Sequence, residues 1–252
     1  MDKIRIVILA AGKGKRMNNH EVPKVLIDFK GQPLIQHLLN EVKASVLDPH
    51  PVIVVGRQAE IVKESLKDGY EFILQKELLG TGHAVKQTKE ALRGKAENVM
   101  VLYGDHPYLT ATSIKKLADI HISKNHLITL MTFKVPDFEN QYSFAYDFGR
   151  IARDEHGNIR EIVEKKDANE EQSKITELNP AYFCFQAEWL WENLEKLKND
   201  NVQKEYYLTD LAKIAIDQGL RIDSIDIDPK EAIGINTPEQ LELAKKIKIN
   251  EH

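Results

Sequence analysis

The stretch Ile6-Val7-Ile8-Leu9-Ala10-Ala11-Gly12-Lys13-Gly14-Lys15-Arg16-Met17 stands at the start of the chain and decides the fold. It opens with an apolar run, which is typical of a strand buried on both faces. The run leads into a glycine-rich loop with cationic side chains, and Lys24 follows shortly afterwards. Glycines let backbone N–H groups approach an anion closely, and the cations add positive charge. The stretch therefore predicts a strand followed by a phosphate-binding loop.

Two common phosphate-binding loops do not fit this stretch. A Walker A loop requires a glycine at the position that Met17 occupies here. The dinucleotide fingerprint Gly-x-Gly-x-x-Gly requires its third glycine there as well, and a methionine would crowd the contact between strand and helix. The stretch thus indicates neither a P-loop NTPase nor an NAD enzyme. A glycine-rich turn with incidental surface lysines is the plain structural alternative.

Composition limits the class of protein. The 252 residues carry a formal net charge of −4, and their basic side chains are scattered, so no footprint for nucleic acid is present. The single cysteine, Cys184, excludes an internal disulfide, and its apolar neighbours indicate core packing. No apolar stretch is long enough to span a bilayer or to form the core of a signal peptide. We therefore expect no membrane partner and a cytoplasmic location.

Apolar runs and amphipathic stretches alternate through the first half of the chain. This alternation is typical of βαβ units and predicts an α/β protein with a Rossmann-like, mostly parallel sheet and flanking helices. Strands are expected at 4–9, 52–55, 72–74, 99–103 and 127–133, and helices around 34–42, 61–66, 84–92 and 114–120. In such sheets the ligand binds beyond the carboxyl ends of the strands, where Gly12 and Asp105 both fall.

The second half of the chain has shorter elements. Expected are a hairpin over 149–153 and 159–164, a strand over 182–186 and a helix over 189–197. Thr209 is expected to cap a further helix, and Thr237 with Pro238 to begin the last one. The polar stretch 165–173 is expected to be a mobile loop.

Polar side chains follow two other predicted strands. Asp105 could be a Mg²⁺ ligand that bridges to substrate phosphates, or it could merely cap the turn that follows the strand. Gln75 carries an amide that both donates and accepts hydrogen bonds, so it can bind the edge of a base. Gly80-Thr81-Gly82 opens a helix shortly after it.

Together these segments resemble the nucleotidyltransferases that activate sugar 1-phosphates, and among them the uridylyltransferase domain that makes UDP-N-acetylglucosamine. The matching stretches span nearly the whole chain: 9–17 with 23–26, 79–84, 102–105, 149–151, 162–168 and 205–210. The resemblance implies the nucleotide-diphospho-sugar transferase fold with a small β-rich insertion. It also implies a single domain, 1–252, with a nucleotide-binding half at 1–135 and an acceptor-binding half at 136–252.

The resemblance also implies a role for each residue that matches a motif. The nucleoside triphosphate, with UTP favoured, would be held by Leu9, Ala10, Ala11, Gly12, Gly14, Gln75, Gly80 and Thr81. The sugar 1-phosphate, with N-acetylglucosamine 1-phosphate favoured, would contact Tyr103, Gly104, Gly149, Glu164 and Asn179. Arg16 and Lys24 would grip the phosphates as catalytic residues. Asp105 and Asn236 would bind Mg²⁺.

The reaction implied by the resemblance needs no covalent nucleophile. The acceptor phosphate attacks the α-phosphorus in line, and pyrophosphate leaves. Positioning and charge neutralisation would supply the catalysis. Because the attacking phosphate is already ionised, no general base is required, and we expect His83 and His106 to be structural.

The chain departs from the family pattern in several places. In the family, the pyrophosphorylase usually continues into a β-helix of hexapeptide repeats that acetylates glucosamine 1-phosphate. The present sequence ends at His252 without such a repeat, so we expect no acetyltransferase activity from this polypeptide. Asn179-Pro180-Ala181 stands where the family has Asn-Thr-Gly, so that a backbone donor is lost and a methyl group is added. The run 144–148 before Gly149 is longer and more aromatic than the family pattern, and it lacks the family's glycine. These last two changes concern the acceptor, so a different acceptor stays open.

Other functions also stay open. A cytidylyltransferase, or another nucleotidyltransferase with a different small phosphorylated acceptor, would use the same residues. A glycosyltransferase often carries an Asp-x-Asp metal pair, and 226–228 has that spacing, but strand alternation predicts that these carboxylates face solvent. A non-catalytic nucleotide sensor would need no clamp for a leaving group. The combination of Arg16, Lys24, Asp105 and Asn236 argues against such a sensor.

Overall fold

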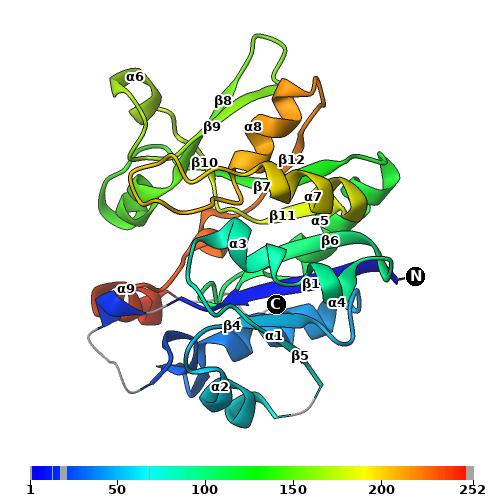
Figure 1. Ribbon diagram of the computed structural model, residues 1–252. Helices are drawn as coiled ribbons and strands as arrows, with labels where there is room; N and C mark the ends of the chain where they lie inside the picture. The colour runs from blue at the N-terminus through cyan, green and yellow to red at the C-terminus, as the bar shows by residue number, and fades with distance from the viewer. Residues whose placement is uncertain (1, 13, 18–21, 68, 248–252) are drawn as a thin grey trace.

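Strand β1 (Asp2–Ala10) lies inside the main sheet because both of its faces are apolar (Figure 1). Ile6 and Ile8 pack into one core, whereas Val7 and Leu9 pack into another core. Successive side chains of a strand point to opposite faces, so such a strand has to be covered by helices on both sides. This computed structural model describes residues 2–12, 14–17, 22–67 and 69–247.

The strands around β1 are parallel, as predicted. β1 pairs with β4 (Val52–Val55) on one side and with β6 (Ala96–Tyr103) on the other, and β5 (Glu71–Leu74) pairs with β4. Parallel strands end at the same edge of a sheet. The residues that follow these strands, Gly12, Gly56, Gln75 and Asp105, therefore lie along one edge.

The second half of the chain completes the same sheet. β11 (Phe183–Gln186) lies antiparallel between β6 and β7 (Ile128–Lys134), and β12 (Asp223–Asp226) pairs in parallel with β7. The predicted β-rich insertion follows β7 and rises above the main sheet in Figure 1. It consists of β8 (Gly149–Arg153), β9 (Ile159–Val163) and β10 (Glu177–Asn179), all antiparallel to their neighbours. The sheet is therefore mixed.

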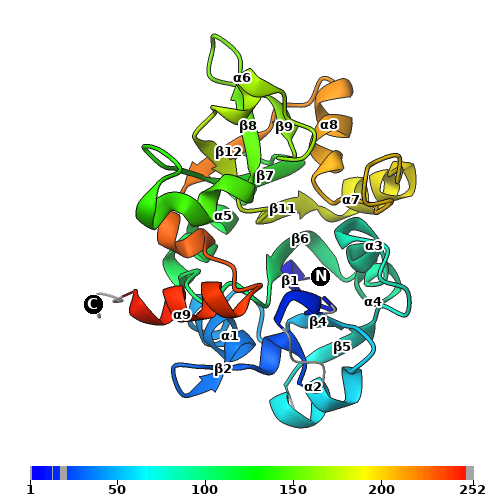
Figure 2. The same cartoon turned by 90° about the vertical axis from the view of Figure 1, so that its left-hand side faces the viewer.

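Helices cover both faces of the sheet. One layer consists of α1 (Leu34–Ser45), α2 (Ala59–Leu66) and α5 (Ala111–Ser123). The other consists of α3 (Thr81–Lys86), α4 (Lys89–Leu92), α7 (Ala187–Asn193) and α8 (Asp210–Asp217). Figure 2 shows α1 with the last helix, α9 (Pro238–Lys246), on one side, and α3 with α4 on the other. Thr237 caps α9 as predicted, because its hydroxyl accepts the N–H of Gln240 at 3.2 Å.

Short elements join these layers. They are β2 (Asp28–Phe29), β3 (Gln32–Pro33) and the 3-10 helices η1 (Lys15–Met17), η2 (Lys24–Leu26), η3 (Asn140–Asp147), η4 (Leu194–Lys196) and η5 (Pro229–Ala232). Asp226 and Asp228 are exposed on either side of the buried Ile227, as the alternation predicted. Cys184 is buried in the core, also as predicted. Among the described residues, none of the helices is both long and apolar enough to cross a bilayer.

Two local predictions are wrong. The stretch 165–173, expected to be a loop, contains the helical turn α6 (Glu170–Ser173). Asn169 and Gln172 form a capping box there, and each side chain accepts the backbone N–H of the other residue. Thr209 does not cap α8, because its own backbone is helical (φ −61°, ψ −25°) and its hydroxyl donates to Oε1 of Glu164.

Candidate active site

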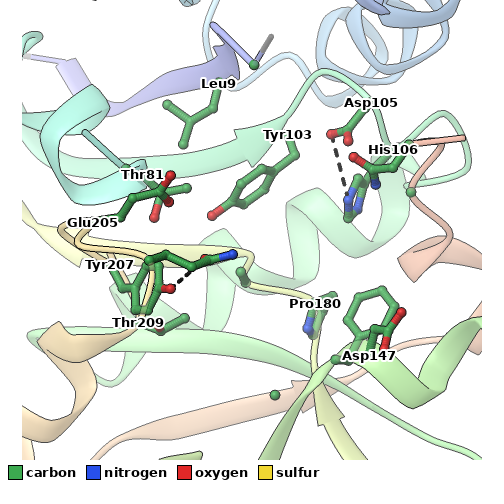
Figure 3. A pocket seen from close by; sticks show the side chains of 18 of the residues that line it. Leu9, Thr81, Tyr103, Asp105, His106, Asp147, Pro180, Glu205, Tyr207 and Thr209 are labelled. Atoms are coloured by element: carbon green, nitrogen blue, oxygen red, sulfur yellow. Dashed lines mark hydrogen bonds and ion pairs between the residues drawn. The ribbon is translucent and has the colours of Figure 1, made fainter. Parts of the chain in front are cut away.

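A cavity of about 1010 Å³ lies at the carboxyl ends of β1, β5 and β6. Its opposite wall comes from β8, β10 and the segment 202–209. Figure 3 shows Thr81, Tyr207 and Thr209 at one side of the cavity and Asp105 with His106 at the other. Nearly all of the predicted site residues line this single space: Leu9, Ala10, Ala11, Gly12, Gly14, Arg16, Lys24, Gln75, Gly80, Thr81, Tyr103, Asp105, Gly149, Glu164, Asn179 and Asn236. Lys13 lies outside the described residues.

Gly104 has a different position from the one predicted. It is absent from the cavity wall formed by the described residues, although its neighbours Tyr103 and Asp105 belong to that wall. Its N–H donates to the carbonyl of Leu9 at 3.0 Å. A Cβ atom at Gly104 would lie 3.1 Å from Cδ1 of Ile35. This glycine therefore permits close packing between the end of β6 and α1, and its position gives no support to a contact with the acceptor.

Lys24, Asp105 and Asn236 meet at one point of the cavity. Nζ of Lys24 donates to Oδ2 of Asp105 at 2.5 Å and to Oδ1 of Asn236 at 2.8 Å. The side chains of Lys24 and Asp105 are only 10% and 12% exposed. Burial alone would raise the pKa of Asp105, but the charge of Lys24 and the hydrogen bond that it donates lower this pKa below its usual value. Asp105 is thus an ionised carboxylate that already faces a cation.

The oxygens of Asp105 and Asn236 suit a hard cation. Mg²⁺ prefers oxygen ligands and is usually held by one or two protein groups, with substrate phosphates and water supplying the rest. A carboxylate and an amide oxygen that both accept from one ammonium group match this donor set. Within the described ranges, His, Cys, Asp and Glu side chains form no cluster of three or more that could hold a metal without a substrate. The two oxygens therefore suit a metal ion whose other ligands come from substrate phosphates and water.

The end of the cavity that is predicted to hold the base contains Gln75, which is buried. Nε2 of Gln75 donates to the carbonyl of Gly80 at 3.1 Å and lies 3.1 Å from Nδ1 of His83. Burial lowers the pKa of His83, which favours the neutral ring, with one ring nitrogen as donor and the other as acceptor. The amide of Gln75 both donates and accepts hydrogen bonds, so it remains suited to the edge of a base. These contacts favour the structural role that was expected for His83.

The loop 79–82 is locked against the segment 205–208. The N–H of Tyr206 donates to the carbonyl of Leu79, and the N–H of Gly82 donates to the carbonyl of Tyr206, both at 2.8 Å. The N–H of Leu208 donates to Oγ1 of Thr81 at 3.0 Å. Gly80 has φ +105°, and a Cβ atom there would lie 2.6 Å from the carbonyl oxygen of Tyr206. Only glycine combines this backbone conformation with this close contact.

The end of the cavity that is predicted to hold the acceptor contains Glu164, Asn179 and the residues that depart from the family pattern. Burial raises the pKa of Glu164, and the hydroxyl of Thr209 at 2.8 Å acts in the opposite direction. Oδ1 of Asn179 accepts the N–H of Ala181 at 2.9 Å, and Ala181 has φ +64°, a conformation that favours glycine. Figure 3 shows Asp147 close to Pro180 on this side of the cavity. The altered residues therefore lie on the cavity wall itself.

His106 contacts Asp105 from the protein side. Nδ1 of His106 lies 2.6 Å from the hydroxyl of Tyr182, which donates to the carbonyl of Glu231 at 2.8 Å. Nε2 of His106 lies 3.8 Å from Oδ1 of Asp105. The pKa of His106 is lowered because the ring is buried. These contacts favour the structural role that was expected for this residue.

Sequence reasoning missed Gly56 as a residue that shapes the site. Gly56 follows β4 directly, and a Cβ atom there would lie 2.6 Å from the carbonyl oxygen of Ala11 in the glycine-rich loop. A glycine at the end of a parallel strand beside β1 would have indicated this close approach, because both strands end at the same edge. The hydrogen bond from Thr209 to Glu164 was missed as well, and no local pattern predicts it.

Residues 6–210 match the family described as MobA-like NTP transferase domain. The chain belongs to this family. The NTP transferase is similar to the bifunctional protein GlmU of Enterococcus faecalis, with 40% identity over 98% of this chain and 52% of that protein. It is also similar to GlmU of Desulfotalea psychrophila, with 37% identity over 96% of this chain and 69% of that protein. The chain spans about half the length of most of the curated relatives it matches.

Solved structures share the fold of the NTP transferase. UDP-glucose pyrophosphorylase complexed with UDP-glucose superimposes with a TM-score of 0.78 at 17% identity, over 97% of both chains. CMP:2-keto-3-deoxy-manno-octonic acid synthetase complexed with CTP gives a TM-score of 0.68 at 14% identity, also over 97% of both chains. These comparisons confirm three predictions. They are the nucleotide-diphospho-sugar transferase fold, the likeness to sugar-1-phosphate nucleotidyltransferases and the enzyme class, a nucleotidyltransferase.

Proposed function

We propose that this NTP transferase joins a nucleoside triphosphate to a sugar 1-phosphate in a Mg²⁺-dependent reaction that releases pyrophosphate. UTP and N-acetylglucosamine 1-phosphate are the favoured pair. The observation that carries the proposal is one cavity that holds the glycine-rich loop, the base loop 79–82, the acceptor wall and the junction of Lys24, Asp105 and Asn236. The similarity to GlmU over nearly the whole chain supports this choice of substrates.

The geometry accounts for each part of this reaction. Backbone N–H groups of the loop after β1 bind the triphosphate, and the exposed Arg16 and the partly buried Lys24 neutralise its charge. Bound at Asp105 and Asn236, Mg²⁺ would neutralise charge on the same phosphate oxygens. The acceptor wall orients the second phosphate so that its oxygen forms a bond to the α-phosphorus while the bond to pyrophosphate breaks. That oxygen is already ionised, so no side chain has to remove a proton.

A cytidylyltransferase is the second candidate, and Gln75 is the observation that favours keeping it. The amide oxygen of Gln75 can accept from N3–H of uracil or from the exocyclic amine of cytosine. The altered acceptor wall at Asp147, Pro180 and Ala181 also fits an acceptor other than N-acetylglucosamine 1-phosphate. Both candidates share the phosphate chemistry and differ only in base and acceptor.

Pyrophosphate release tests the proposal. The purified protein is incubated with Mg²⁺ and UTP, CTP, dTTP, ATP or GTP, each against N-acetylglucosamine 1-phosphate, glucose 1-phosphate and a pool of small phosphorylated metabolites. Turnover restricted to UTP with N-acetylglucosamine 1-phosphate is the expected result. Turnover with CTP and another acceptor would replace the first candidate with the second. Absence of release from every pair would contradict both.

Lys24→Ala is expected to lower kcat/KM at least tenfold, or by about 1.4 kcal/mol of transition-state stabilisation. The variant loses the ammonium that reaches Asp105 and Asn236, and with it one charge available to the triphosphate. Lys43→Ala, which removes an exposed lysine from α1, is the matched control and should retain full activity. Unchanged kinetics in Lys24→Ala would remove this lysine from the phosphate clamp.

A further inference from the structure

The segment 205–209 contacts both ends of the cavity. On the base side, the backbone of Tyr206 pairs with Leu79 and Gly82, and the N–H of Leu208 donates to the hydroxyl of Thr81. On the acceptor side, the hydroxyl of Thr209 donates to Oε1 of Glu164 at 2.8 Å. Figure 3 shows Thr81, Glu205, Tyr207 and Thr209 together at one side of the cavity, opposite Asp105 and His106. One short segment therefore joins the loop proposed to hold the base to the carboxylate proposed to hold the acceptor.

The side chain of Thr209 is used in an unusual way. Threonine directly before a helix usually accepts a backbone N–H of the first turn and so caps the helix. Thr209 precedes α8 but forms no side-chain cap among the described contacts, because its backbone is already helical. Its hydroxyl reaches back to Glu164 in the β-rich insertion instead. Thr209 thus forms a contact with a residue distant in sequence in place of the local helix cap. Such exceptions to local sequence preferences are expected at functional sites.

Glu164 needs this contact because its surroundings disfavour the charged carboxylate. Burial is the main cause of its raised pKa, and Asp167 adds repulsion. Asp210, whose own pKa rises to about 6 through burial and through repulsion from Glu164 and Asp167, also faces it. Tyr103 and Tyr207 are the other titratable groups beside it, and Lys166 is the nearby cation. The Thr209 hydroxyl directly stabilises the ionised form, which accepts hydrogen bonds from a ligand.

We propose that Thr209 is a positioning residue for the acceptor: it holds Glu164 as an ionised, correctly oriented hydrogen-bond acceptor and links that orientation to the loop 79–82. The donated hydrogen bond occupies Oε1 of Glu164 and leaves Oε2 available to donors on the acceptor, such as sugar hydroxyls. This inference rests on the proposed function for the identity of the ligand. The hydrogen bond itself can be tested without any ligand.

A titration of Glu164 tests the hydrogen bond directly. Protein with ¹³C-labelled glutamate side chains is titrated by NMR, and Glu164 is assigned as the signal missing from Glu164→Gln. Thr209→Val keeps the shape of the side chain but removes the donor, so the pKa of Glu164 should rise further. Thr209→Ser keeps the donor and should titrate as the wild type does. Identical titration of all three proteins would overturn the proposal.

Kinetics test the role in acceptor binding. With UTP and N-acetylglucosamine 1-phosphate as probes, Thr209→Val should raise the KM of the acceptor about tenfold and leave the KM of UTP nearly unchanged, and Thr209→Ser should restore it. The acid limb of kcat/KM for the acceptor should move to higher pH in Thr209→Val. Equal effects on both substrates, or none, would overturn the proposal.

Two further results separate the possible causes of failure. Since Thr209 does not cap α8, Thr209→Val should unfold at nearly the wild-type temperature, and a large decrease would show a structural role instead. If the wild type turns over no substrate pair, the proposed function fails. The titration then still decides whether Thr209 holds Glu164.

Discussion

Replacing Asp105 with asparagine is expected to reduce kcat at least about a hundredfold, or by about 2.7 kcal/mol, with much less effect on binding of the nucleoside triphosphate. Asparagine has the same shape and still accepts a hydrogen bond from Lys24, so the buried junction keeps its packing. The negative charge that a divalent cation requires is lost. Pyrophosphate release measures kcat, and nucleotide titration by calorimetry measures binding.

Asp226→Asn is the matched control for this substitution. Asp226 is an exposed carboxylate at the end of β12 and is not one of the described residues that line the cavity. The control should have wild-type kinetics. Normal turnover by Asp105→Asn would show that the metal assignment is wrong, whereas an equal loss of binding and turnover would make Asp105 a nucleotide-binding residue.

Gly80→Ala is expected to have the next largest effect. It should raise the KM of the nucleotide at least about tenfold and reduce the free energy of unfolding by about 2–4 kcal/mol. Gly80 has φ +105°, and an added Cβ atom would lie 2.6 Å from the carbonyl oxygen and 2.8 Å from the nitrogen of Tyr206. Both contacts are to backbone, so either the base loop or the segment 205–208 has to move.

Gly157→Ala separates the clash from the backbone conformation. Gly157 has φ +80° in the turn between β8 and β9, and nothing described lies within 4 Å of an added Cβ atom. Urea unfolding should show only the conformational cost there, about 1 kcal/mol, and nucleotide kinetics should not change. Equal losses in the two variants would mean that the contact between the base loop and Tyr206 is unimportant.

The part of the fold predicted best is the part that local sequence determines. The apolar run of β1 and the alternation after it predict parallel strands, because each strand is buried on both faces and each helix connects to its neighbour. The position of β11 between β6 and β7 could not be predicted in this way. That pairing joins segments far apart in the chain, and hydrophobic pattern specifies the register of a strand but not its partner.

The site shows the same division. Asp105 alone was equally compatible with a metal ligand and a turn cap, and only the resemblance to a family pointed to Asn236 as its companion. Thr209 follows the pattern of a helix cap, yet a tertiary contact with Glu164 replaces that local interaction. Gly104 and Gly56 both follow strands that end at the same edge. Which of them lies against the glycine-rich loop depends on packing distances that the sequence does not contain.

The hydrogen bond from Lys24 to Asn236 joins residues 212 positions apart in the chain. Contacts of such high separation form late, because the entropy of closing the intervening chain has to be overcome first. During synthesis, the glycine-rich loop and Asp105 leave the ribosome long before Asn236 does. A chain shortened before Asn236 would therefore lack one of the two proposed metal ligands. We therefore expect pyrophosphate release only from chains that include the segment before α9, which carries Asn236.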